Sequence, residues 1–242
     1  GTHKPEVSGS IPLPATKTMA LSIVIPVYKE KNNLKELVRR ISKSFKEKNY
    51  EIIIIDDNSN DGTKEILKKL KKKFKKLKFF IRKKKPRDLS KSCVFGFSKA
   101  KFKNILVMDG DLQHRPEEIN KLYKNFIKLK CDFVVGSRNL LKKKNTGLSF
   151  TRLITSVILI FIVNLFLGFK TKDPMSGFFI FKKKIFTQNK KKLFNKGYKI
   201  LLDLIYSSKF NSIYDININF KSREKGFSKM DIKVISLLMF IS

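Results

Sequence analysis

The sequence is poor in acidic residues and in cysteine. Asp and Glu number 20 against 54 Lys and Arg, which gives a formal net charge of +34. This excess points to an anionic partner, namely nucleic acid, an anionic membrane surface or a phosphorylated substrate. The alternative is a general bias of the composition towards lysine, without a functional meaning. The two cysteines, Cys93 and Cys131, stand in apolar surroundings without metal-ligand spacing. We therefore expect two small core residues in a reduced, cytosolic setting.

Long apolar runs are scarce as well. Residues 1–18 have no apolar core, so we expect a disordered leader rather than a signal peptide. Residues 153–169 carry no charge over 17 positions, a little short of the ~20 residues that span a bilayer. A membrane span, a buried helix and an interfacial helix all fit this stretch, and we favour the amphipathic interfacial helix because soluble-type sequence lies on both sides. The apolar tail, residues 231–242, is interpreted as the start of a second membrane-interface helix.

Apolar runs alternate with helical patterns between residues 21 and 136. Strands are expected over residues 21–27, 50–55, 79–82, 105–108 and 131–136, and helices from near residue 34, from near residue 63, over 90–101 and over 117–129. Asn32 or Asn33 is the expected cap of the first helix, and Asp61 or Thr63 that of the second. Strands that alternate with helices predict an α/β fold with a three-layer sandwich and a mainly parallel sheet.

Two aspartates follow the fourth expected strand. Asp109 and Asp111 are separated by Gly110 and come directly after a buried apolar run. Open α/β sheets bind ligands at the carboxyl ends of their strands, and alternate residues of an extended strand share a side, so both carboxylates are expected to reach one cation. Hard oxygen ligands suit Mg²⁺ or Mn²⁺. An Asp-x-Asp pattern alone also fits a solvated turn.

Six separated segments strengthen the functional interpretation. They are Ile25–Glu30, Asp56–Thr63, Asp109–His114, Val135–Arg138, Asp173–Phe178 and Arg223–Lys229. In this order they resemble the inverting GT-A glycosyltransferases of family 2, in the branch similar to dolichol-phosphate mannosyltransferase. The resemblance covers about residues 21–235 and implies a Rossmann-like GT-A core over residues 19–150, the interfacial helix over 151–172, and the rest of the catalytic domain with an acceptor loop over 173–230.

The resemblance also implies ligands and residue roles. A nucleotide-sugar donor, usually GDP-mannose, is expected to meet Pro26, Tyr28, Glu30, Ile55, Asp57, Asp109, Gly110, Asp111, Arg138, Arg223 and Lys229. A divalent metal is expected at Asp109, Asp111 and Gln113. The phosphate of a polyprenyl-phosphate lipid is expected at Arg138, Arg152, Ser156 and Arg223, and the residues expected to take part in catalysis are Asp109, Asp111, Arg138 and Arg223.

The sequence departs from the family pattern at one position and in one segment. Gly110 stands between the aspartates where Ala is common, and Arg87–Lys91 stands where eukaryotic members carry a Gly-Leu-Gly loop. This segment is similar to a bacterial variant of that loop.

The sequence thus predicts a membrane-associated hexosyltransferase on the cytoplasmic face. A close alternative is transfer of glucose from UDP-glucose to a polyprenyl phosphate. A remote alternative is a non-catalytic basic protein that binds membrane or nucleic acid. The presence of Asp109, Asp111, Arg138, Arg223 and Lys229 in the family's spacing argues against it, because such binding does not require that spacing. No nucleic-acid partner is expected.

Overall fold

A seven-stranded sheet forms the centre of the computed structural model, which describes residues 20–138, 168, 170–197 and 199–219. The strands are β1 (Leu21–Val27), β2 (Tyr50–Asp56), β3 (Leu77–Ile81), β4 (Asn104–Val107), β5 (Phe133–Arg138), β6 (Phe179–Lys182) and β7 (Ile213–Ile218). Their order across the sheet is β3-β2-β1-β4-β6-β5-β7. β6 runs antiparallel to β4 and β5, whereas β1 with β2, β1 with β4, β2 with β3 and β5 with β7 are parallel pairs. The prediction of a mainly parallel sheet is confirmed.

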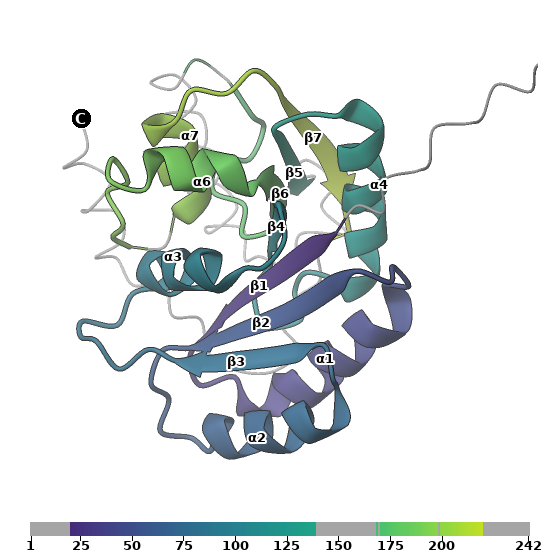
Figure 1. The fold of residues 1–242 in the computed structure, drawn as a ribbon, viewed down its shortest axis with the longest axis vertical. Coiled ribbons are helices and arrows are strands. Elements are labelled where there is room, and N and C mark those ends of the chain that lie inside the picture. The colour runs from purple at the N-terminus through teal and green to yellow at the C-terminus, as the bar shows by residue number, and fades with distance from the viewer. Residues whose placement is uncertain (1–19, 139–167, 169, 198, 220–242) are drawn as a thin grey trace, which may run out of the picture.

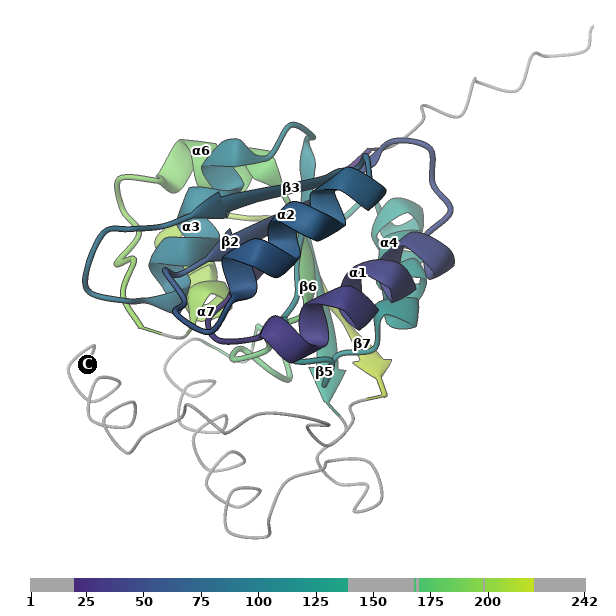
Figure 2. The same cartoon turned by 90° about the horizontal axis from the view of Figure 1, so that it is seen from below.

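Helices cover both faces of the sheet (Figure 1). One face carries α1 (Lys31–Ser44), α2 (Thr63–Lys73) and α4 (Ile119–Leu129), which follows the 3₁₀ turn η1 (Pro116–Glu118). The other carries α3 (Leu89–Lys99), α6 (Lys183–Asn189) and α7 (Ile200–Ser207), and Figure 2 shows these layers from below. The isoleucines of β2 illustrate why the strand is apolar throughout. Ile52 and Ile54 enter the first core, Ile53 and Ile55 enter the second, and all four are fully buried.

The direction of the chain connections changes between β1 and β4. β1 pairs with β2 on one side and with β4 on the other, so chain connections leave in opposite directions at this point. Such a switch point leaves a crevice at the carboxyl ends of the strands. Because β6 is antiparallel, residues 173–178 lead into it from that same edge, where Phe179 pairs with Val107.

Local predictions were partly wrong. α1 begins at Lys31 after Glu30, and neither Asn32 nor Asn33 caps it, because Asn33 faces inward and its Nδ2 donates to Glu30 Oε2 at 2.7 Å. The N-cap of α2 is Gly62, so neither Asp61 nor Thr63 caps this helix as expected. Asp61 still has a structural role, because its Oδ1 accepts the Thr63 N–H at 3.1 Å.

Element ends also differ from the predictions by a few residues. β3 begins at Leu77 rather than residue 79, β5 begins at Phe133 rather than residue 131, and η1 occupies the expected first turn of the fourth helix.

The predicted membrane-interface helices lie mostly or wholly outside the described residues. Within the described part of the chain, no helix is long and apolar enough to cross a bilayer. Residues 153–167, 169 and 231–242 are not among those described. The interfacial helices and the domain boundaries therefore stay predictions.

Candidate active site

Asp109 and Asp111 lie at the carboxyl end of β4, as predicted, but not in extended chain. β4 ends at Val107, and residues 110 and 111 form a turn that continues into Leu112 with φ +65°. The pleat of a strand therefore does not align the two carboxylates. Asp111 is buried and its Oδ1 accepts from the Gln113 N–H at 3.1 Å, whereas the side chain of Asp109 is 37% exposed. One carboxylate is fixed in the turn and the other is open to a ligand.

Glycines stand where the chain passes close to this turn. A Cβ on Gly110 would lie 2.6 Å from Val27 Cγ1, and a Cβ on Gly177 would lie 2.4 Å from Asp109 Oδ2. Both distances are shorter than carbon atoms tolerate, so either alanine would force a displacement. The first contact explains the departure from the family pattern at Gly110, because glycine here makes room for the branched Val27 side chain at the end of β1.

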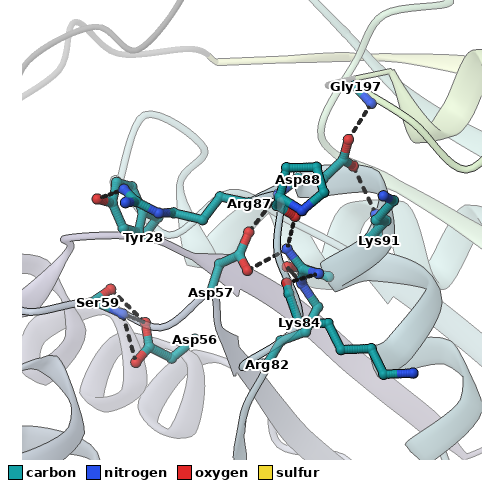
Figure 3. A network of polar contacts seen from close by, with 12 residues as sticks. Tyr28, Asp56, Asp57, Ser59, Arg82, Lys84, Arg87, Asp88, Lys91 and Gly197 are labelled. Atoms are coloured by element: carbon teal, nitrogen blue, oxygen red, sulfur yellow. Dashed lines mark hydrogen bonds and ion pairs between the residues drawn. The ribbon is translucent and has the colours of Figure 1, made fainter.

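The loop before α3 builds the neighbouring part of the edge (Figure 3). The carboxylate of Asp57, just beyond β2, accepts the Asp88 N–H at 2.7 Å through Oδ2 and forms an ion pair with Arg82 Nη2 at 2.5 Å through Oδ1. Burial raises the pKa of Asp57, and the hydrogen bond from Asp88 and the charge of Arg82 act against that rise. Asp57 is thus a desolvated carboxylate held in one orientation.

Arg82 is in turn held by the loop that it organises. Its guanidinium donates to Lys84 O at 2.7 Å, to Pro86 O at 2.9 Å and to Ser92 Oγ at 3.2 Å. Sequence reasoning gave Arg82 no role beyond the end of a strand. One sequence feature could have indicated a site role for Arg82: it directly follows the apolar strand β3, whose last residue, Ile81, pairs with Asp56 at the end of β2.

Asp88 links this loop to a distant segment. Its Oδ1 accepts the Lys91 N–H at 3.0 Å and caps α3, and its Oδ2 accepts the Gly197 N–H at 2.7 Å (Figure 3). Ser90 N–H donates back to Gly197 O at 2.9 Å. The segment Arg87–Lys91, which departs from the eukaryotic pattern, is therefore an ordered part of the edge.

Tyr28 and Glu30 follow β1 at the same edge. The Arg87 guanidinium lies 4.5 Å from the centre of the Tyr28 ring, and its Nη1 contacts the phenol oxygen (Figure 3). Glu30 is buried beside Asn33. The aromatic ring of Tyr28, the oriented carboxylate of Asp57 and the long side chain of Arg87 form a group that suits a nucleoside.

The aspartate next to Asp57 has a different role. Asp56 Oδ1 accepts from Ser59 Oγ at 2.5 Å and from the Ser59 N–H at 3.2 Å, and burial raises its pKa. Its hydrogen bonds close the turn after β2, so Asp56 is structural.

Cys93 of α3 carries a free, buried thiol. Burial raises the pKa of Cys93 well above its ordinary value, and the negative charges of Asp109 and Asp88 act in the same direction. The geometry joins the Asp109 turn to the end of β1 instead: a Cβ on Gly110 would lie 2.6 Å from Val27 Cγ1, and Tyr28 follows directly after Val27.

The remaining predicted site residues divide into three groups. Pro26 is buried in β1, and the Ile55 side chain is fully buried against α3, so a ligand contact through the Ile55 side chain is not supported. Arg138 ends β5, where its backbone pairs with Ile218. Arg152, Ser156, Arg223 and Lys229 lie outside the described residues.

The donor set fits a hard divalent ion that is shared with a substrate. Among the described residues, no three His, Cys, Asp or Glu side chains are grouped as a complete metal site. Mg²⁺ is commonly held by one or two carboxylates together with substrate phosphates and water, and Asp109 and Asp111 provide the two carboxylates. His114, whose Nε2 lies 3.3 Å from Asp109 Oδ2, was not assigned a role from the sequence.

Comparison with known proteins identifies the family. Residues 22–189 match the domain described as glycosyl transferase family 2. The chain belongs to glycosyltransferase family 2. It is 35% identical over 219 residues to the dolichol-phosphate mannosyltransferase of Pyrococcus furiosus, a match that covers 90% of this chain and 61% of that protein.

Two further proteins named dolichol-phosphate mannosyltransferase are also similar. The identity is 34% with the protein of Mycosarcoma maydis, over 94% of this chain and 79% of the relative, and 31% with that of Saccharomyces cerevisiae, over 88% and 82%. The chain thus spans about three fifths of the Pyrococcus furiosus relative and about four fifths of the other two.

Solved structures confirm the GT-A fold. Glucosyl-3-phosphoglycerate synthase from Mycobacterium tuberculosis, in complex with phosphoglyceric acid, superimposes with a TM-score of 0.65 at 15% identity, over 86% of this chain and 73% of that one. The same enzyme with Mn²⁺, uridine diphosphate and glucosyl-3-phosphoglycerate gives 0.64 at 15% identity, again over 86% and 73%. A divalent metal is therefore found among proteins of this fold.

Proposed function

We propose that this chain transfers mannose from GDP-mannose to a polyprenyl phosphate at the cytoplasmic face of a membrane, with Mg²⁺ or Mn²⁺ at Asp109 and Asp111. The observation that carries the proposal is the Asp109–Asp111 turn beside the Tyr28–Asp57–Arg87 group, at the switch point between β1 and β4. The names of the three relatives support the choice of mannose and of a lipid phosphate.

The acceptor determines what the protein has to do. A phosphate monoester loses its second proton with a pKa of about 6, so it is already anionic at neutral pH and attacks without a general base. The remaining tasks are to position the two substrates and to stabilise charge. A bound divalent ion supplies charge stabilisation to the departing nucleoside diphosphate. Asp109 and Asp111 would hold that ion, and Tyr28, Glu30 and Asp57 would hold the nucleoside end of the donor.

Basic residues are assigned to the phosphates. β5 is parallel to β4 through the antiparallel β6 between them, so Arg138 stands at the carboxyl edge of the sheet. Arg223 comes five positions after Ile218, where β7 ends beside Arg138. Guanidinium groups bind phosphate oxygens in a fork, which lets Arg138 and Arg223 hold two anions close together despite their repulsion.

Lys229 is assigned to the donor, with Gln113 beside the ion. Arg152 and Ser156 are assigned to the acceptor phosphate, because they fall in an apolar stretch that suits a lipid at the membrane surface. The basic excess of the chain also suits an anionic leaflet.

Direct displacement by the lipid phosphate inverts the sugar. An α-linked donor then gives a β-linked polyprenyl phosphate mannose. The anomeric configuration of the product is a direct test of this mechanism.

A panel of donors tests the proposal. GDP-mannose, GDP-glucose, UDP-glucose and UDP-mannose are each supplied with a short polyprenyl phosphate and Mn²⁺, with and without EDTA, and the lipid product is measured. We expect product from GDP-mannose in the presence of the ion only. Transfer from UDP-glucose instead would establish the glucosyltransferase alternative, and no transfer from any donor would contradict the assigned activity.

A further inference from the structure

The carboxylate of Asp109 is contacted by two residues that are far apart in the sequence, His114 and Gly177. Nε2 of His114 lies 3.3 Å from Asp109 Oδ2. On the same carboxylate, a Cβ added to Gly177 would lie 2.4 Å from Oδ2, 2.8 Å from Oδ1 and 2.8 Å from Cγ. The carboxylate thus packs directly on the backbone at Gly177 while it remains 37% exposed. It has room to reach a ligand but little room to turn.

His114 is itself fixed by the core. The residue is buried, and its ring centre lies 5.1 Å from that of Phe178, which is fully buried. Phe178 is held in turn by its own backbone, since its carbonyl accepts the Gly136 N–H at 2.8 Å and its N–H donates to Ser176 Oγ at 3.1 Å. The His114 ring cannot rotate away from Asp109 without disturbing this packing.

We propose that His114 and Gly177 are positioning residues for Asp109. His114 donates its Nε2 hydrogen to Oδ2 and fixes the carboxylate in the orientation that meets the divalent ion, and Gly177 leaves the space that this orientation needs. A ligating carboxylate that is oriented by a hydrogen bond binds metal more tightly, and loss of such a partner costs about 10–100-fold in affinity. The inference rests on the proposed function, because it takes Asp109 as a metal ligand.

Metal binding without turnover tests His114. Mn²⁺ is titrated into the whole chain in the presence of saturating GDP, and free Mn²⁺ is followed by its electron paramagnetic resonance signal. His114→Phe keeps a ring against Phe178 but removes the donor, and we expect it to weaken Mn²⁺ binding about 10–100-fold. His114→Gln keeps a donor at the reach of Nε2 and should restore most of the affinity. Equal affinities of wild type and His114→Phe would overturn the proposal.

Gly177 has a matched control in α3. A Cβ on Gly96 would lie 2.4 Å from Val24 Cγ1, the same approach as at Gly177 but against a core side chain instead of Asp109. Both alanine variants should lose thermal stability, and only Gly177→Ala should also weaken Mn²⁺ binding. If Gly96→Ala weakens Mn²⁺ binding as much, the effect is general loosening and Gly177 has no positioning role.

The outcome is separable from that of the proposed function. If UDP replaces GDP as the nucleotide that supports Mn²⁺ binding, the assignment of GDP-mannose fails while the His114 comparison is carried out with UDP. If the wild-type chain binds no Mn²⁺ with either nucleotide, Asp109 is not a metal ligand and the positioning proposal is wrong.

Discussion

Arg82→Met tests whether the ion pair with Asp57 holds the nucleoside side of the site together. Both side chains are 7% exposed and their charged atoms are 2.5 Å apart, so removal of the guanidinium leaves a desolvated carboxylate without its counter-charge. Breaking a buried pair in this way costs about 3–5 kcal/mol of unfolding free energy. The carbonyls of Lys84 and Pro86 lose a donor as well, at about 1 kcal/mol each if water does not replace it.

The pH dependence of this loss has a definite sign. Burial already raises the pKa of Asp57, and Arg82 acts against that rise, so the variant should raise the pKa further. An acid with a raised pKa in the folded state favours folding below its unfolded pKa, and that contribution is lost as pH rises through the folded pKa. Arg82→Met should therefore be least destabilised near the unfolded pKa of about 3.9 and most destabilised at neutral pH.

A double variant separates stability from binding. Arg82→Met with Asp57→Asn leaves no buried charge and keeps an acceptor for the Asp88 N–H, so it should recover a large part of the lost free energy in urea unfolding. It should not recover binding of GDP with Mn²⁺ in calorimetry, because the fixed carboxylate is absent. A loss below about 1 kcal/mol in the single variant would mean that the pair is solvated in solution. Wild-type GDP affinity in the double variant would remove Asp57 from the nucleoside site.

The remaining predictions concern other parts of the fold. Asp111→Asn should abolish most turnover and leave the urea midpoint nearly unchanged, and activity that survives both this change and EDTA would exclude a metal role. Gly110→Ala should lower the free energy of unfolding by about 1–3 kcal/mol, because the added methyl group meets Val27. Adding Val27→Ala to that variant should relieve the overpacking. If the double-mutant cycle shows no coupling between the two changes, the packing argument is wrong. Burial acts to raise the pKa of Glu51, but hydrogen bonds from Lys78, Lys101 and Ser22 outweigh it, so the pKa is lowered from 4.5. The stability that Glu51 contributes should therefore be lost as pH falls below about 4.5. Glu51→Gln should lack this component of the acid unfolding transition, which circular dichroism follows.

The sequence by itself determined the class of fold and the order of the elements as far as β5, whereas β6, α6, α7 and β7 were not predicted. Strands buried on both faces have to be apolar at every position, and the run Ile52–Ile55 can satisfy this only within a covered sheet. The short apolar run before Asp109 and the helical pattern around it then fix where the chain meets the carboxyl edge. The six motifs in their order identified the family. Several of them follow directly after apolar runs, so the end of each strand could be located from the local sequence alone.

Tertiary structure decided how the site is held. Asp57 pairs with Arg82, and Asp88 accepts the Gly197 N–H. Asp109 lies against His114 and against the backbone at Gly177. Contacts such as Asp88 to Gly197 join residues more than 100 positions apart, so no local pattern contains them. Whether Asn33 caps a helix or faces inward also depends on what packs against it. The sequence determines which groups are available, whereas their partners and orientations follow from burial, which only the folded chain defines.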